Sequence, residues 1–319
     1  MTLFELNDDN PGSAQSPEPL RATVSEVPSA PAFNEVPPGD PFTYGAQHPQ
    51  PYYFAPPAMP DLSVPWSWGH LILFLIYGFF ALAAVQVTFI TYYVATKAIS
   101  AHPTQKEFQQ FALTKPVFAI GSMVLWYALL FGFLYITLTF FYRTPFWQSL
   151  GWRKLDHENR KAPLKPWLYF FMGSGLSLVV MIITITVKAP ENAPIQDLFK
   201  NRNMAFAFMG MAVLIAPLVE ETIFRGYLFP MFARWFGIVP GIVVTGILFG
   251  LMHGYQLGWA WKLVVTLAGV GIVFTFVRSR AQSTLASFLM HLGYNSLIAF
   301  FGVIGLIHEI YSKVPPAHR

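Results

Sequence analysis

The chain has 319 residues, of which 54% are hydrophobic and 11% charged, and its formal net charge is +4. Soluble domains carry about 25% charged residues, so this composition indicates a protein that lies largely in a membrane. The sequence contains no cysteine, which excludes disulfides, thiolate zinc sites and a cysteine nucleophile.

Residues 1–65 form an acidic tail that holds 14 of the 26 prolines and has a net charge of −7. Such a segment buries too little apolar surface to offset its chain entropy, so we expect it to be disordered. It could serve as a tether or dock a protein partner. The rest of the chain has a net charge of +11, placed in short loops between apolar stretches. This distribution indicates membrane orientation and not nucleic-acid binding.

Seven apolar stretches follow the tail, and most are long enough for a membrane-spanning helix of about 20 residues. They lie near residues 71–95, 117–142, 167–187, 203–235, 239–254, 261–279 and 283–303. The predicted fold is therefore all-α, a polytopic transmembrane bundle of about seven or eight spans. The protein should be an integral, multi-pass membrane protein in contact with lipid.

The loop 143–166 between the second and third stretches carries six basic residues and two acidic ones. Positive charge in short loops favours the cytoplasmic side of a membrane. We therefore expect this loop, and with it the N-terminal tail, to be cytoplasmic.

Only two acidic residues after the tail, Glu220 and Glu221, fall inside a predicted span. An ionisable group in the middle of a membrane helix costs a few kcal/mol, so such residues point to function. Glu221 and Arg225 are four residues apart and face each other on a helix, where an ion pair can neutralise both. That pair could also be a purely structural clamp. Glu220 points about 100° away and must find its partners on other helices.

Two histidines, His253 and His291, lie inside predicted spans, and Asn295 shares a helix face with His291. Their depth follows from the rise of 1.5 Å per residue. Measured from the side where neighbouring spans turn, Glu220 lies roughly 22 Å deep, His253 roughly 21 Å, His291 about 12 Å and Asn295 about 18 Å. These polar side chains occupy one slab of depth and could meet.

A carboxylate beside histidines in a partly dry cavity can act as a general base on water. Nearby donors, such as an imidazole and an amide, can stabilise an oxyanion. The pattern thus favours hydrolysis of an acyl bond, in particular a peptide bond. Other membrane-protease plans are excluded, because the sequence has no HExxH or GxSxG motif and no Asp inside a predicted span.

Three motifs occur in order, each within an apolar stretch. They are EExxxR from Glu220 to Arg225, FxxxH from Phe249 to His253 and HxxxN from His291 to Asn295. Together they resemble the CAAX-protease and bacteriocin-processing family, also called the ABI family, which includes type II CAAX prenyl proteases. The resemblance implies an endopeptidase acting on a membrane-associated substrate, of which a CAAX-type prenylated protein is one example.

The resemblance also implies roles for the motif residues. Glu220 and His253 would activate the water, and His291 and Asn295 would stabilise the oxyanion. The six candidate site residues, including a supporting ion pair, are Glu220, Glu221, Arg225, His253, His291 and Asn295.

Glu220 and the two histidines could form a His₂Glu zinc site. They come from separate helices without a local ligand motif, however, so we favour a mechanism without a cofactor. Two other functions stay open: a non-catalytic scaffold or self-immunity protein of the same fold, and a transporter that relays protons through carboxylates.

The resemblance covers about residues 203–303, which would form the catalytic core. Residues 66–190 would supply accessory helices, and residues 304–319 a short C-terminal tail.

Overall fold

The computed structural model describes residues 62–104, 107–108, 111, 114–155, 164–185, 187 and 193–312. In this part of the chain the regular structure is helical and no strand occurs, which confirms the all-α prediction. The predicted disorder of the tail 1–65 falls outside the described residues, except for residues 62–65.

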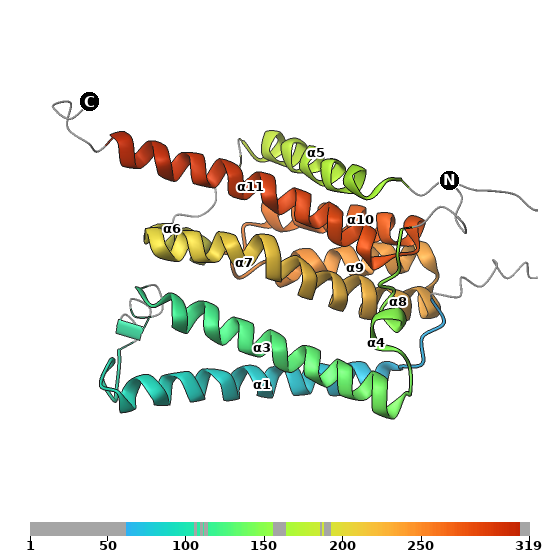
Figure 1. Cartoon of the computed structure of the whole chain (residues 1–319), viewed down its shortest axis with the longest axis horizontal. Coiled ribbons are helices and arrows are strands. Elements are labelled where there is room, and N and C mark those ends of the chain that lie inside the picture. Colours follow the sequence, from blue (N-terminus) through green and yellow to red (C-terminus); the bar gives the residue numbers. More distant parts are fainter. Residues whose placement is uncertain are drawn as a thin grey trace, which may run out of the picture. The chain divides into compact units, whose positions relative to one another are not determined.

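The helices follow the predicted apolar stretches closely (Figure 1). In chain order they are α1 (Trp68–Ala95), α3 (Pro116–Ile136), η2 (Thr137–Phe141), α4 (Phe146–Ser149), α5 (Pro166–Thr184), α6 (Pro194–Phe199), α7 (Arg202–Glu220), η3 (Glu221–Leu228), α8 (Phe229–Phe236), α9 (Ile238–Met252), α10 (Trp261–Ala281) and α11 (Thr284–Ser312). Segments η2 and η3 are π-helices, in which an amide donates to the carbonyl five residues back.

Six helices in the described part of the chain are long and apolar enough to cross a membrane. The protein is therefore an integral membrane protein. The stretch 239–254, which we expected to be a fifth span, is α9, and its 15 residues fall short of the others. Fifteen residues rise only about 22 Å, whereas a bilayer core is about 30 Å thick. At the other end of the chain, α11 continues to Ser312, into the segment predicted as a C-terminal tail.

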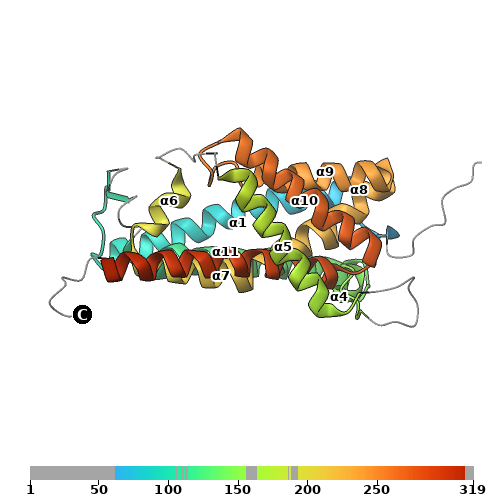
Figure 2. The same ribbon diagram turned by 90° about the horizontal axis from the view of Figure 1, so that it is seen from above.

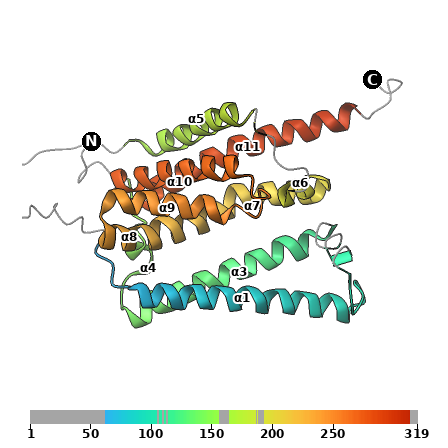
Figure 3. The ribbon, with the colours of Figure 1, turned by 180° about the vertical axis from the view of Figure 1, so that it is seen from behind.

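The helices α1 and α3 pack against each other as a hairpin, and α3 also contacts α7. On the other side of α7 lies α11, which contacts α5, α7 and α10. Figure 2 shows α5 lying obliquely across α11. The short α9 packs between α8 and α10, and the view from behind in Figure 3 shows these helices beside α7. Residues of α3, α7, α9, α10 and α11 can thus face a common interior.

Glycines allow the crossing of α5 and α11. A Cβ added to Gly173 would collide with the carbonyl oxygen of Met290, and one added to Gly293 would collide with the carbonyl oxygen of Phe170. Because neither glycine has a side chain, the two backbones approach closely, as small residues permit in membrane helices. This crossing fixes the position of α11, which carries two of the candidate site residues.

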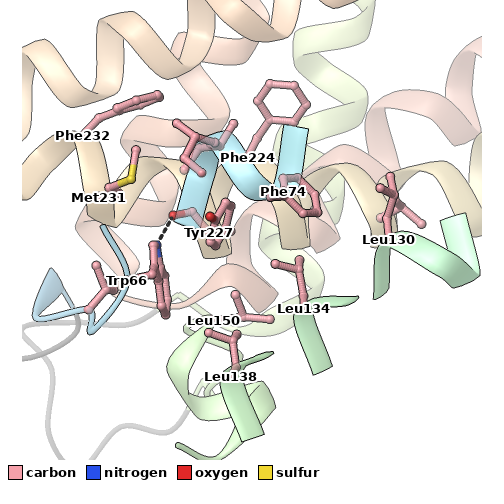
Figure 4. Close-up of a cluster of buried hydrophobic side chains, with 14 of the residues drawn as sticks. Trp66, Phe74, Leu130, Leu134, Leu138, Leu150, Phe224, Tyr227, Met231 and Phe232 are labelled. Carbon is pink, nitrogen blue, oxygen red and sulfur yellow. Dashed lines mark hydrogen bonds between the residues drawn. The ribbon is translucent and has the colours of Figure 1, made fainter. Parts of the chain in front are cut away.

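A large apolar cluster joins the α1–α3 hairpin to η3 and α8 (Figure 4). Leucines four residues apart on one face of α3 and η2 contribute to it, and so does Leu150 of the basic loop. The labelled members are Trp66, Phe74, Leu130, Leu134, Leu138, Leu150, Phe224, Tyr227, Met231 and Phe232. The described beginning of the basic loop is therefore packed into the protein and supports η3.

Candidate active site

The two glutamates lie where α7 ends and the π-helix η3 begins. Glu220 is the last residue of α7, and its side chain is 12% exposed and faces a cavity. Glu221 is the first residue of η3 and is fully buried. The sequence indicated the contrast between the two glutamates but gave no sign of the π-helix. Single π-helical turns within longer helices occur frequently at functional sites.

Arg225 is fully buried and forms the predicted ion pair with Glu221, with 2.9 Å between Nη1 and Oε1. Its other nitrogens donate to α10: Nη2 to the carbonyl oxygen of Gly271 at 3.0 Å and Nε to the hydroxyl of Thr275 at 3.3 Å. The guanidinium carbon lies 4.5 Å from the centre of the Phe249 ring, a cation–π distance. The ion pair therefore connects η3 to α9 and α10.

His291 lies between the two glutamates. Its Nδ1 is 3.0 Å from Oε1 of Glu221, and its Nε2 is 3.8 Å from Oε2 of Glu220. An ionised carboxylate can only accept hydrogen bonds, so Nδ1 carries the hydrogen and donates a hydrogen bond to Glu221. The Asn295 amide nitrogen lies 3.2 Å from His291 Nε2 and also donates to the carbonyl oxygen of Ala212 at 2.8 Å.

His253 caps the C-terminus of α9, although the sequence placed it well inside a span. The reason is that α9 ends at Met252, where the chain turns towards α10. His253 Nδ1 lies 2.8 Å from the carbonyl oxygen of Phe249. A carbonyl only accepts, so Nδ1 donates, and in the neutral imidazole Nε2 then keeps a free lone pair. That Nε2 is 3.9 Å from Oε1 of Glu220.

The structure thus brings together all six candidate residues, from α7, η3, α9 and α11. Both imidazole Nε2 atoms face the Glu220 carboxylate at 3.8 and 3.9 Å. These separations are too long for hydrogen bonds and suit a bridging water molecule. The arrangement can hold a water molecule beside a general base.

A zinc ion would require a tighter arrangement. Tetrahedral zinc has bonds of about 2.0–2.1 Å, which sets its ligand atoms about 3.3 Å apart. Within the described ranges, no group of three His, Cys, Asp or Glu side chains is arranged to hold a metal ion. The observed separations of 3.8 and 3.9 Å give the zinc alternative no support, and we propose a mechanism without a metal step.

A cavity of about 270 Å³ opens beside Glu220, and most of its wall is apolar. Its lining includes Met123, Tyr127, Ile195, Phe199, Phe208, Met209, Met211, Leu267, Val270, Phe274, Tyr294 and Ile298, together with Glu220, His253, His291 and Asn295. Tyr127 belongs to α3, and Ile195 and Phe199 belong to α6. Sequence reasoning missed these residues, because an aromatic or aliphatic side chain in an apolar helix carries no signal of its own.

A comparison with models of known protein families shows which family this part of the chain resembles. Residues 202–297 match the family described as type II CAAX prenyl endopeptidase Rce1-like. This segment of the chain is therefore similar to that family, and we call residues 202–297 the Rce1-like core. The matched segment contains all six candidate residues, and α1, α3 and α5 lie outside it. The Rce1-like family is in general a protease family. No curated protein and no solved structure matches the chain.

Proposed function

We propose that this protein is an intramembrane endopeptidase that cleaves a peptide bond of a membrane-associated substrate. The observation that carries the proposal is the convergence of His253 Nε2 and His291 Nε2 on the Glu220 carboxylate, at the wall of an apolar cavity. Titratable groups that face a cavity inside a membrane are functional by default.

In this proposal a water molecule bridges Glu220 and His253. It donates one hydrogen bond to the carboxylate and one to the free lone pair of His253 Nε2, which leaves a lone pair on the water oxygen for attack. Glu220 removes the proton as the oxygen adds to the scissile carbonyl carbon, and it then transfers that proton to the leaving amine. His253 orients the water, and its own orientation is fixed by the Phe249 carbonyl.

The tetrahedral intermediate carries a negative charge on the former carbonyl oxygen. We assign the stabilisation of this charge to Asn295 and His291, which line the same cavity as Glu220. In the resting arrangement His291 Nε2 faces the Asn295 amide as an acceptor, so His291 donates to the oxyanion only in its protonated form. The Glu221 carboxylate at Nδ1 stabilises that imidazolium. Glu221 and Arg225 thus support the reaction without contacting the substrate.

The cavity wall supports a proposal for the substrate class. Apolar and aromatic side chains of α3, α6, α7 and α11 offer a surface that suits a hydrocarbon chain better than a polar peptide. We therefore propose a lipid-modified peptide, of the CAAX-type prenylated class, as the substrate. We further propose that the N-terminal tail is cytoplasmic and available to a protein partner.

The test of this function is the variant Glu220→Gln in proteoliposomes with a membrane-associated, prenylated peptide. Loss of the general base should reduce cleavage by about 10²- to 10⁴-fold, while the protein still folds. Glu107→Gln is the matched control, since Glu107 is exposed and, among the described residues, its carboxylate accepts hydrogen bonds from Thr104. Cleavage by Glu220→Gln within a few-fold of the wild type would refute the proposal.

The same preparations separate the two alternatives. A carboxylate-relay transporter would take up solute, lose uptake in Glu220→Gln and cleave no peptide. A scaffold would lose its partner when residues 1–60 are deleted, whereas the proposed peptidase would keep cleaving.

A further inference from the structure

The π-helix η3 is held from outside the Rce1-like core. Tyr227 of η3, two residues after Arg225, is fully buried. Its carbonyl oxygen accepts a hydrogen bond from the Trp66 indole nitrogen at 3.1 Å, which Figure 4 shows as a dashed line. The two rings also stack, with 5.2 Å between their centres. On the other side, the Tyr227 hydroxyl lies 2.7 Å from Nδ1 of His70 in α1.

The segment that carries Trp66, residues 62–67, forms a strap across η3 and α8. The guanidinium of Arg234 in α8 donates to the backbone carbonyls of Val64 and Trp66, the latter at 2.8 Å. Trp66 itself is fully buried in the apolar cluster that contains Phe224 and Met231. The strap is therefore fixed by side-chain hydrogen bonds to both segments.

A π-helical turn needs such support, because its hydrogen-bond geometry is rarely favoured in an isolated helix. In η3 the Phe229 amide donates to the carbonyl of Phe224, five residues back. A return to α-helical geometry would shorten the hydrogen-bond spacing in this turn from five residues to four. The helical segments before and after the turn would then rotate by about 100° relative to each other about the helix axis. Arg225 could then no longer reach both Glu221 and the Gly271 carbonyl of α10. Glu220 would lose its alignment with the histidines.

We propose that Trp66 and His70 are positioning residues that keep η3 in its π-helical register and so align Glu220, Glu221 and Arg225. This inference rests on the proposed function, and it makes the strap and the start of α1 part of the working enzyme. Neither residue contacts the cavity that holds Glu220. Both act through Tyr227, by one bond to its backbone and one to its hydroxyl.

Two variants remove these bonds and keep an aromatic ring at each position. Trp66→Phe also replaces the buried indole by a smaller phenyl ring, a change in size that the control variant shares. Trp66→Phe deletes the indole donor, and Tyr227→Phe deletes the hydroxyl that His70 contacts. Each loses one buried hydrogen bond, so kcat should fall about 3- to 10-fold while KM stays within about twofold. The matched control is Trp68→Phe, because Trp68 packs on the rings of Phe232 and Phe236 next to the strap. Its kcat should equal that of the wild type.

A second measurement does not depend on catalysis. Amide hydrogen exchange of residues 221–228 should accelerate in Trp66→Phe and Tyr227→Phe, while exchange across α10 stays at the wild-type rate. Faster exchange confined to η3, together with a lower kcat, supports the inference. Unchanged exchange in η3 overturns it, and so does faster exchange throughout the protein, which would indicate a general loss of stability.

The two proposals fail in different ways. A wild-type protein that cleaves no peptide would refute the proposed function, but the amide hydrogen-exchange experiment would still decide whether the strap holds η3 in place. If the wild type is active and neither Trp66→Phe nor Tyr227→Phe lowers kcat, only the inference about the strap is refuted.

Discussion

The buried ion pair offers the sharpest test of the site's energetics. Glu221→Gln keeps the shape of the side chain and removes one charge from a pair in which both partners are fully buried. The Arg225 guanidinium then stays in the interior without a counter-charge, and the proton donor of His291 loses its carboxylate partner. Removing one partner of a buried ion pair costs about 3–5 kcal/mol.

The structure favours the lower end of that range. Arg225 keeps its hydrogen bonds to Gly271 and Thr275 and its contact with the Phe249 ring. A loss of about 3 kcal/mol in a protein of this size lowers Tm by roughly 4–6 °C, because the entropy of unfolding is about 2.1 cal/mol/K per residue. The double variant Glu221→Gln/Arg225→Gln removes both charges and should recover part of this loss, because no unpaired ion is left in the interior.

The assay is a melting curve in detergent, recorded next to peptide cleavage for each variant. Glu220→Gln should behave in the opposite way to Glu221→Gln. Its side chain is partly exposed to the cavity and lies 3.8 Å or more from the histidines, so Tm should stay near the wild-type value while cleavage disappears. If Glu220→Gln melts far below the wild type and Glu221→Gln melts normally, we have assigned the two carboxylates the wrong way round.

Two further predictions concern packing and metal dependence. Gly173→Ala should destabilise the protein by about 1–3 kcal/mol, because its new Cβ collides with α11. The control Gly175→Ala lies on the same helix, but its Cβ meets open space, so this variant should melt like the wild type. Equal Tm values for the two variants would contradict the close crossing of α5 and α11. Treatment with a chelator should leave peptide cleavage unchanged, since water activation is assigned to Glu220 and His253. Cleavage that disappears with the chelator and returns when zinc is added would contradict the metal-free mechanism.

The sequence by itself determined the helices and the local pairings. Apolar stretches of suitable length gave the membrane helices, because a backbone in lipid must satisfy its own hydrogen bonds. The four-residue spacing of Glu221 and Arg225 was enough to predict their ion pair, and the pair survives even though the turn is π-helical. The three motifs also identified the two histidines and the asparagine that line the cavity with Glu220. Spacing along one helix is a local property, so it can be read from sequence.

Contacts between helices were decided only by the tertiary structure. His291 and Glu221 are 70 positions apart, and the 3.0 Å contact between them depends on how α11 packs against η3. The same holds for Trp66 and Tyr227, which are 161 positions apart and whose residue types are ordinary in an apolar segment. The end of α9 at His253 and the π-helical register of η3 likewise depend on neighbouring segments. Such features follow from packing energies summed over several helices, which no single stretch of sequence contains.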